Sequence, residues 1–316
     1  MRYVAGLDGG GTKTAVTIAD WNGNAVHTFA VGPLNFNGQD EASVRAALRD
    51  ICGEIARVCG DLDACEGICI GAAGISNPAV SGRLKAGLRD GGYRGGLVLV
   101  GDHETALCGA HEGLPGIILI AGTGSICYGR GADGAVHRAG GFGHLIDDEG
   151  SGYSIGRDLL SAVVRASDGR EAETVITRLV YDRLGIGSVQ EVVGFVYDKS
   201  RNKKDIAALA PLLTEACEAG DAAALRIAER NAAALAELAS AVTARLGMER
   251  GALAMAGSVL LHNGHVREAF LQRMAERFPH LRCGAGKRDA SYGAVLLALQ
   301  SLRALPGTGD AEGAAP

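Results

Sequence analysis

Short apolar segments with period-two alternation open the chain, and polar turns separate them. The alternation predicts strands over residues 3–7, 14–19 and 25–31, joined by a glycine-rich turn at 8–12 and a hairpin turn at 22–24. The elements expected next are a helix over 40–59, a buried strand over 67–71, a helix over 78–88 and a buried strand over 97–100. This order predicts a mixed sheet with helices packed on it.

A second, similar unit begins near residue 116. The pattern predicts strands over 116–121, 125–129 and 135–139, with a Gly/Thr turn at 122–124 and an Asp-Gly hairpin turn at 133–134. The order of strand, Gly/Thr turn and strand therefore occurs twice, by pattern rather than by residue identity. We interpret this as two similar lobes, each with one glycine-rich hairpin.

The second half of the chain is mainly helical in pattern. Asp221 is the expected N-cap of one long helix, and Gly247 is expected just past its C-terminal end. Apolar residues follow this helix in steps of three and four, at Leu225, Ala228, Ala232, Leu235, Ala239, Val242 and Leu246. This narrow seam predicts a core helix against the second sheet, with a dimer interface as the alternative. A buried strand over 253–256 and a last helix over 290–302 follow.

Composition excludes several classes of protein. The formal charge is −5, which opposes a protein that binds nucleic acid through phosphate contacts. Glycine contributes 48 of the 316 residues, about twice its average share, which favours tight turns and close approach of the backbone to a ligand. Every apolar run is far shorter than the ~18 residues of a membrane span, and Asp8 precedes any signal-peptide core. We expect no nucleic-acid or membrane partner and a cytoplasmic location.

The cysteines fit a reducing compartment. There are eight, at Cys52, Cys59, Cys65, Cys69, Cys108, Cys127, Cys217 and Cys283. None forms a C-x-x-C pair, and most stand among apolar residues. We interpret them as small buried thiols rather than as a disulfide framework or a zinc site.

Two turns have the composition of phosphate-binding loops. In Asp8–Thr14, three successive glycines leave backbone N–H groups open, the Thr12 hydroxyl group can donate to a phosphate oxygen, and Asp8 can hold Mg²⁺. A strand rather than a helix follows, so the segment is neither a Walker A loop nor a Rossmann turn. Gly122–Ser125 has the same character. A plain tight hairpin is the alternative for either turn alone, whereas the pair favours a polyphosphate ligand.

A third glycine pattern matches a known fingerprint without its structural context. Gly129, Gly131 and Gly134 have the spacing of the dinucleotide-binding motif. A short strand follows them, with no helix whose N-terminus could hold a pyrophosphate. We therefore reject a dinucleotide site here.

Asp102 follows the predicted strand at 97–100 and opens a helix expected over 104–112. Ligands of open α/β sheets bind beyond the carboxyl ends of strands, where this carboxylate can accept a proton from an attacking hydroxyl group. The alternative is that Asp102 only caps the helix.

An acidic, glycine-rich segment, residues 140–152, precedes another predicted helix. It contains the three consecutive acids Asp147, Asp148 and Glu149, flanked by apolar side chains. Buried carboxylates are costly unless they bind something, and sugar hydroxyl groups are suitable partners; a solvated acidic loop at a helix start is the alternative. The Gly-Ser turn in Ala256–Val259 gives a weaker indication of a flat ring lying against the backbone, as adenine requires.

In this order, these segments resemble the sugar kinase, Hsp70 and actin ATPase superfamily and, within it, the N-acetylglucosamine kinase and BadF/BadG/BcrA/BcrD ATPase family. The segments that carry the resemblance are Gly6–Thr14, Gly101-Asp102 with Ala106-Leu107, Ala121–Ser125, Gly140–Tyr153 and Ala256–Val259. The resemblance implies an α/β fold of two RNase H-like lobes of the actin/hexokinase type, with mixed sheets and with ATP and sugar in the interlobe cleft. The implied lobes are 1–114 with 289–303, and 115–288; we expect 304–316 to be a disordered tail.

The resemblance also implies roles for single residues. Implied nucleotide contacts are Gly10, Gly11, Thr12, Lys13, Thr123, Gly124, Gly257 and Ser258. Implied sugar contacts are Asn35, Asp102, Gly141, Phe142, Gly143 and Asp148. Asp102 matches the base that deprotonates the sugar 6-hydroxyl group. ATP with Mg²⁺ at Asp8 and a homodimer are expected as well.

Two residues depart from the family pattern and leave the substrate open. Asp147 stands where the family usually has Gly, and Phe142 stands where Trp is common. We predict ATP-dependent phosphorylation of an amino sugar, with N-acetylglucosamine first and glucosamine or N-acetylmuramic acid as alternatives. The zinc-bearing sugar-kinase branch is excluded by the cysteine spacing. The alternatives from other classes are an ATP-driven activator of a dehydratase or reductase with an iron–sulfur cluster, and a non-catalytic ATP-binding module.

Overall fold

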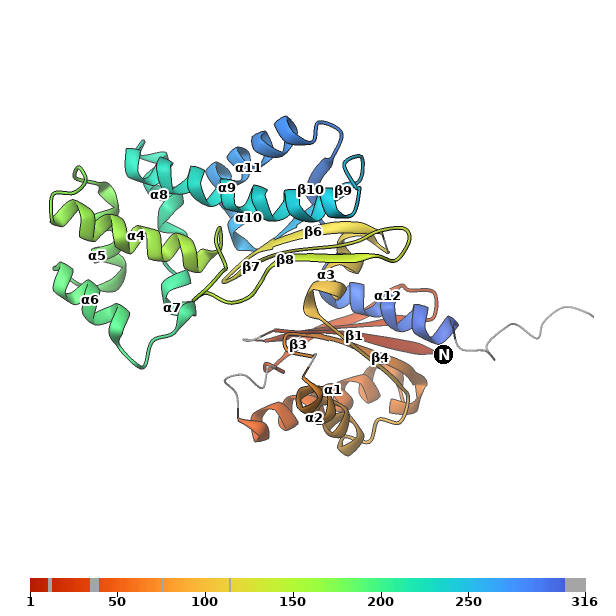
Figure 1. The fold of residues 1–316 in the computed structure, drawn as a ribbon. Helices are drawn as coiled ribbons and strands as arrows, with labels where there is room; N and C mark the ends of the chain where they lie inside the picture. The colour runs from red at the N-terminus through yellow and green to blue at the C-terminus, as the bar shows by residue number, and fades with distance from the viewer. Residues whose placement is uncertain (11–12, 35–39, 76, 114, 305–316) are drawn as a thin grey trace, which may run out of the picture. The chain divides into compact units, whose positions relative to one another are not determined.

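The computed structural model describes residues 1–10, 13–34, 40–75, 77–113 and 115–304. The chain divides into two compact units (Figure 1). Unit 1 comprises Met1–Leu114 and Gly286–Pro316, and unit 2 comprises Pro115–Ala285. The predicted site residues Gly11, Thr12 and Asn35 lie outside the described residues, as do residues 305–316 of the predicted tail.

Unit 1 is built on a five-stranded mixed sheet with the order β3-β2-β1-β4-β5. Its strands are β1 (Tyr3–Gly9), β2 (Thr14–Asp20), β3 (Ala25–Val31), β4 (Cys65–Ala72) and β5 (Gly96–Val100). β1, β2 and β3 form an antiparallel meander, whereas β4 lies parallel to β1 and β5 lies parallel to β4. The strands predicted in this part of the sequence are confirmed; β4 begins at Cys65, earlier than the predicted start at residue 67.

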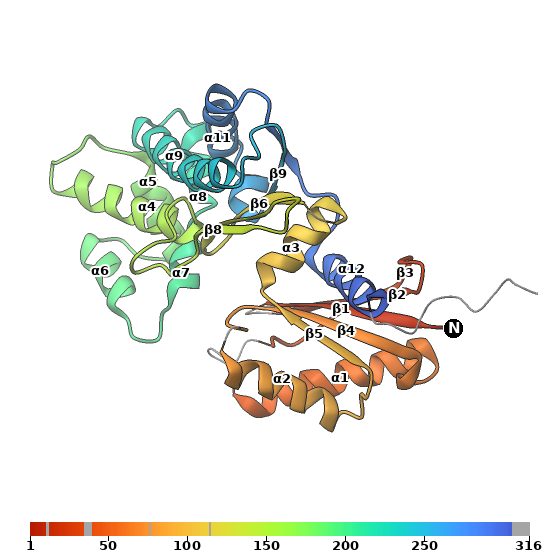
Figure 2. The same cartoon turned by 45° about the vertical axis from the view of Figure 1, so that its right-hand side comes forward.

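Helices cover both faces of this sheet (Figures 1 and 2). On one face, α1 (Glu41–Cys59) and α2 (Pro78–Asp90) bury an apolar cluster against the strands. The short 3₁₀ helix η1 (Leu62–Ala64) connects α1 to β4. The other face is covered by α12 (Ala290–Arg303), which also packs on α3 (Asp102–His111). The predicted last helix is therefore confirmed and belongs to unit 1.

Glycine allows α12 to pack directly on its neighbours. A Cβ at Gly6 of β1 would lie 2.1 Å from the Ser291 carbonyl oxygen, and a Cβ at Gly293 of α12 would lie 1.9 Å from the Thr105 carbonyl oxygen. Both distances are shorter than any real van der Waals contact, so no other residue fits without moving the helix.

Unit 2 repeats the plan with a second five-stranded sheet in the order β10-β9-β6-β7-β8. Its strands are β6 (Gly116–Ala121), β7 (Ser125–Arg130), β8 (Val136–Gly140), β9 (Ala252–Ala256) and β10 (Arg282–Ala285). β6, β7 and β8 are antiparallel, and β9 and β10 continue the sheet in parallel from β6. Gly131 and Gly134 lie in the β7–β8 turn, which confirms that they form no dinucleotide motif.

The helices of unit 2 pack around one large apolar core. They are α4 (Gly152–Ser167), α5 (Val175–Leu184), α6 (Val189–Tyr197), α7 (Lys203–Ala207), α8 (Leu212–Glu218), α9 (Ala222–Arg245), α10 (Ser258–His262) and α11 (Gly264–Arg277). The α/β class with two helix-covered mixed sheets is thus confirmed.

The long helix α9 begins and ends where the sequence predicts. The Asp221 side chain accepts a hydrogen bond from the Ala224 N–H, and Gly247 follows the C-cap in a left-handed conformation with φ 62°. Most of the predicted seam is buried in the core of unit 2, which supports the core interpretation; Leu225, at its N-terminal end, is exposed. Among the described helices, none is long and apolar enough to cross a membrane.

All eight cysteines are free thiols, and six of them are buried. Cys65 and Cys69 lie inside β4, and burial raises the pKa of each thiol to about 12. Ligation of an iron–sulfur cluster requires thiolates that can reach the metal. The buried, protonated state of these two residues opposes the activator alternative.

Candidate active site

The first glycine-rich turn joins β1 to β2 in unit 1. The Gly10 N–H donates to the Asp8 carbonyl oxygen at 3.1 Å. A Cβ on Gly10 would lie 2.7 Å from the Lys13 carbonyl oxygen, so a side chain here would force the turn open. Lys13 is exposed. The described part of the turn therefore combines a tight backbone with an accessible ammonium group, and both suit a phosphate ligand.

Asp8, near the end of β1, lies in acidic surroundings. Burial, followed by the negative charges of Asp102 and Asp289, raises the pKa of Asp8 to about 6. A bound cation relieves such repulsion, and Mg²⁺ takes carboxylate oxygens together with water and substrate phosphates. Among the described residues, no group of three His, Cys, Asp or Glu side chains is arranged to hold a metal by itself. Asp8 thus fits a cation whose other ligands are phosphate and water.

Asp102 occupies the first turn of α3, directly beyond the carboxyl end of β5. Gly101, not Asp102, is the N-cap of this helix, so the capping alternative for Asp102 is wrong. The Asp102 carboxylate accepts a hydrogen bond from the His103 backbone N–H at 2.9 Å and lies 3.4 Å from His103 Nδ1. Its side chain is 52% exposed. Burial raises the pKa of Asp102, but hydrogen bonding to His103 outweighs it, so the pKa lies below its usual value. The carboxylate is ionised at neutral pH and can accept a proton.

The second Gly/Thr turn, between β6 and β7, is supported by the start of α4. The Gly122 N–H donates to the Gly124 carbonyl oxygen at 2.9 Å and closes the turn. The Gly152 N–H donates to the Gly122 carbonyl oxygen at 2.7 Å, and the Tyr153 N–H donates to the Thr123 carbonyl oxygen at 3.3 Å. The start of α4 therefore fixes the conformation of the turn.

This second turn borders a cavity of about 450 Å³ within unit 2. The cavity is lined by Gly122, Thr123, Gly152, Ile155, Lys204, Ala207, Ala208, Ala210, Pro211, Thr214, Ser258, Val259, His262 and Asn263. Its walls are largely apolar, with a few polar groups and one lysine, which is the composition of a small-molecule site. Thr123 and Ser258, assigned to the nucleotide from separate segments of the sequence, line this same cavity.

Gly257 sets the geometry of the loop that carries Ser258. Its φ is 87°, and a Cβ there would lie 2.3 Å from the Ala121 carbonyl oxygen. Only glycine satisfies both constraints. The end of β9 is therefore pressed against β6, and α10 begins at Ser258 on the cavity wall.

The three consecutive acids have partners within unit 2. Asp147 accepts from the Phe142 N–H at 3.0 Å. Asp148 is buried, with a φ of 66° that is unusual for a residue other than glycine, and accepts from the Ser125 N–H at 3.3 Å. Glu149 pairs with Arg157. The sequence suggested that these acids require a ligand, because buried carboxylates need partners. Each of them already has a partner in the protein, so that argument is weaker. Asp148 nevertheless adjoins the Gly/Thr turn, because a Cβ on Gly124 would lie 2.9 Å from its carboxylate oxygens.

The segment that precedes these acids presents apolar side chains to solvent. Gly141 and Gly143 have φ values of 76° and 99°, and Phe142 between them is 64% exposed. The Arg138 guanidinium group lies 4.3 Å from the centre of the Phe142 ring. Leu145 and Ile146 are also exposed. The loop thus offers an accessible aromatic face for a ligand.

Sequence reasoning missed several residues of the cavity wall. Lys204, Thr214, His262 and Asn263 come from α7, α8, the last residue of α10 and the N-cap of α11. For Lys204, the sequence contains one local indication: Asn202 and Asp205 form a capping box that marks the start of α7. That the helix faces the cavity follows only from its packing on α4.

Several known proteins that match this chain are kinases of amino sugars. A family model described as the BadF/BadG/BcrA/BcrD ATPase family matches residues 5–298. The chain is 34% identical to an N-acetylmuramic acid/N-acetylglucosamine kinase of Clostridium acetobutylicum, over 94% of this chain and 98% of that protein. It is 29% identical to an N-acetyl-D-glucosamine kinase of Dictyostelium discoideum, over 94% and 97%.

A solved structure extends the likeness to the fold. A protein of Chromobacterium violaceum proposed to be an N-acetylglucosamine kinase superimposes with a TM-score of 0.76 at 27% identity, over 95% of this chain and 99% of that one. The range matched by the family model, residues 5–298, includes both Gly/Thr turns and Asp102. The chain belongs to the BadF/BadG/BcrA/BcrD ATPase family.

Proposed function

We propose that this protein transfers the γ-phosphoryl group of ATP to the 6-hydroxyl group of an amino sugar, with N-acetylglucosamine as the first candidate. The observation that carries the proposal is the 34% identity, over nearly the whole of both chains, to a kinase that acts on N-acetylmuramic acid and N-acetylglucosamine. Glucosamine and N-acetylmuramic acid are the alternative substrates.

The cavity of unit 2 supports the assignment of the nucleotide. Its apolar wall, with Ile155, Pro211 and Val259, suits the faces of an adenine ring, and Ser258 would lie beside the adenosine. Thr123 and Gly124 would contact phosphate oxygens. In unit 1, the turn with Gly10, Gly11, Thr12 and Lys13 would bind phosphate in the same manner.

Asp8 would hold Mg²⁺, directly or through water. When bound, the cation neutralises charge on the phosphates during transfer. The raised pKa of Asp8 supports this role, because the carboxylate lies in a site that disfavours its negative charge until a cation is present.

Asp102 would act as the general base. As the sugar 6-oxygen forms its bond to the γ-phosphorus, the bond from that phosphorus to the β,γ-bridging oxygen breaks, ADP leaves, and the hydroxyl proton passes to the Asp102 carboxylate. The lowered pKa of Asp102 keeps this carboxylate ionised before the reaction.

The sugar would be held by Asn35, Gly141, Phe142, Gly143 and Asp148, with Asp102 at its 6-hydroxyl group. Phe142 is exposed and its backbone N–H is bound by Asp147, so both departures from the family pattern lie in one short loop. We propose that this loop decides among the three amino sugars. We also propose a cytoplasmic location, in keeping with the eight free thiols, and a homodimer, as the family resemblance implies.

The test measures ADP release with MgATP and a panel of N-acetylglucosamine, glucosamine, N-acetylmuramic acid, N-acetylmannosamine and glucose. Strong stimulation by one amino sugar supports the proposal and identifies the substrate. Asp102→Asn should then lower turnover by about 10² to 10⁴ while ADP affinity stays unchanged. Near-normal turnover of this variant would refute the role of Asp102, and a panel without stimulation would refute the proposed substrates and point to a sugar outside the panel.

A further inference from the structure

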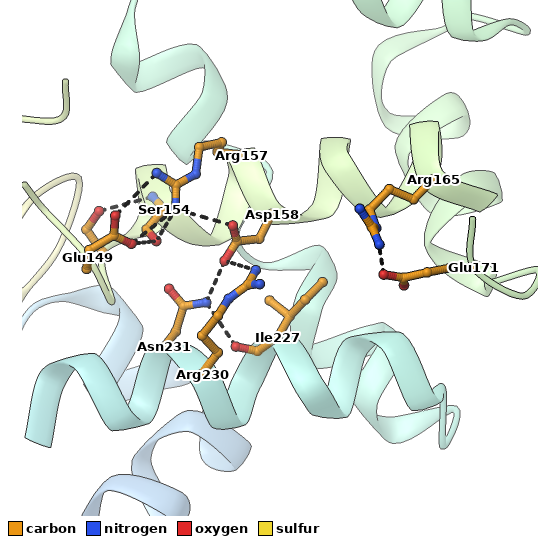
Figure 3. Close-up of polar contacts among 10 residues, drawn as sticks. Glu149, Ser154, Arg157, Asp158, Arg165, Glu171, Ile227, Arg230 and Asn231 are labelled. Carbon is orange, nitrogen blue, oxygen red and sulfur yellow. Dashed lines mark hydrogen bonds and ion pairs between the residues drawn. The ribbon is translucent and has the colours of Figure 1, made fainter. Parts of the chain in front are cut away.

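A charged network inside unit 2 joins the middle of α4 to α9 (Figure 3). At its centre is Asp158 of α4, whose side chain is 7% exposed. Its carboxylate oxygens lie 2.7 Å from an Arg230 nitrogen, 3.0 Å from Asn231 Nδ2 and 3.4 Å from an Arg157 nitrogen. A buried carboxylate is tolerated only with such partners. Asp158 therefore holds two guanidinium groups in place, one on each helix.

Arg157 extends this network to the acidic segment. Its Nη1 and Nη2 lie 3.3 and 3.1 Å from the two carboxylate oxygens of Glu149, so both oxygens are bound by one guanidinium group. Ser154 donates to the same carboxylate at 2.9 Å. A fork of this kind fixes both the place and the orientation of the carboxylate.

Glu149 in turn fixes the residue before it. Its backbone carbonyl oxygen accepts from the Ser125 hydroxyl group at 2.6 Å, and the Ser125 N–H donates to the Asp148 side chain. Asp148 has a left-handed backbone conformation, which persists only where the surroundings impose it. Glu149 is held by its side chain on one side and by its carbonyl oxygen on the other, directly next to the strained Asp148.

We propose that Arg157, anchored by Asp158, is a positioning residue that holds Asp148 ready for the sugar. The proposal rests on the proposed function, in which Asp148 contacts the substrate. It assigns no contact with substrate to Arg157 itself. Ser125 ties the Gly/Thr turn to these acids, but the Gly152 and Tyr153 N–H groups bind Gly122 and Thr123 independently of Arg157. Loss of Arg157 should therefore affect the sugar more than the nucleotide.

The same helix offers a matched control. Arg165 of α4 pairs with Glu171 at 2.7 Å, and its side-chain exposure of 39% is close to the 44% of Arg157. Figure 3 shows this pair at the far end of the helix, away from Glu149. Replacing either arginine by methionine keeps most of the apolar stem and removes the charge and the donors.

The experiment compares Arg157→Met and Arg165→Met in the full-length protein. We expect Arg157→Met to lower kcat/KM for the amino sugar by about tenfold or more, because small misplacements of a substrate contact are costly. The dissociation constant for ADP, measured calorimetrically without sugar, should stay within about twofold of the wild-type value. Arg165→Met should match the wild type in both measurements.

A double-variant cycle identifies the route. Glu149→Gln should lower sugar kcat/KM in the wild-type background and have little further effect in Arg157→Met, since the two residues act in series. Additive losses, or equal losses in Arg157→Met and Arg165→Met, would overturn the proposal. So would a parallel loss of ADP affinity, which indicates general unfolding. Failure of the proposed function is distinct, because the wild-type protein itself would then show no sugar-dependent turnover.

Discussion

The contact between α4 and α7 can be disturbed by a single methyl group. Gly156 lies within α4, and a Cβ there would lie 2.1 Å from the Ile206 carbonyl oxygen and 2.8 Å from the Ile206 carbonyl carbon. The obstacle is backbone, which cannot rotate away as a side chain can. Gly156→Ala therefore has to move α7, whose Lys204 and Ala207 line the cavity of unit 2.

The displacement can be estimated from the contact distances. Restoring a normal van der Waals separation requires a shift of about 1 Å or more. Overpacking of this kind costs about 1–3 kcal/mol. If the nucleotide binds only when α7 is in its original position, binding has to push α7 back against the added methyl group. A cost of about 1–3 kcal/mol for this step corresponds to about 5- to 150-fold weaker affinity. We expect a rise of that size in the dissociation constant for ADP.

The assay is calorimetric titration with ADP, together with urea denaturation. Gly194 provides the control, because it lies in α6 of the same unit and has no atom within 4 Å of an added Cβ. Gly194→Ala should leave ADP affinity unchanged and stabilise the protein by about 0.5–1 kcal/mol, since alanine favours helix over coil. If Gly156→Ala behaves like Gly194→Ala in both measurements, the assigned packing or the assigned nucleotide cavity is wrong.

Two further predictions concern stability. The pKa of Asp8 is raised from 3.8 to about 6 in the folded state, so ionisation of Asp8 lowers the free energy of unfolding. This destabilisation is complete above about pH 6 and disappears as the pH falls below 3.8. Asp8→Asn should raise the free energy of unfolding by about 1–2 kcal/mol at pH 7.5 without Mg²⁺ and by much less at pH 4; equal effects at both pH values in urea titrations would contradict this. Asp158→Asn should cost about 1–3 kcal/mol, because a buried carboxylate with three partners loses its charge. Glu171→Gln, in a more exposed pair, should lower the free energy of unfolding by no more than about 1 kcal/mol in the same titration. Equal decreases for the two variants would show that the burial of Asp158 does not strengthen its contribution to stability.

The parts of the fold that the sequence predicted are those specified locally. The N-terminal strands alternate with period two, and Asn22, Gly23 and Asn24 form a turn that closes on Asp20 through backbone and side-chain hydrogen bonds. The ends of α9 follow from one capping side chain and one glycine. The two Gly/Thr turns could be recognised because the same order of strand, glycine-rich turn with threonine, and strand occurs twice in the sequence.

The parts that the sequence could not predict depend on packing between distant segments. Asp102 follows a strand and precedes a helix, and only the structure shows that Gly101 is the N-cap and leaves this carboxylate exposed. The partner of Glu149 is Arg157, eight residues away in sequence, and the pairing depends on how α4 begins. The place of Lys204 on the cavity wall depends on Gly156, and no local pattern links these two residues.

The position of α12 constrains the order in which the protein can fold during synthesis. The strands of unit 1 are complete by Val100, yet the face that α12 covers keeps Val4 and Cys69 without their apolar partners until Val295 and Leu299 have been made. At ribosomal rates of 5–20 residues per second, the interval to the end of α12 is about 10–40 s. Unit 2 is continuous in sequence and can fold during that interval. The N-terminal segment up to Val100 therefore leaves the ribosome as a sheet with one apolar face open. This face is the point at which a chaperone, or another nascent copy, can act on the protein.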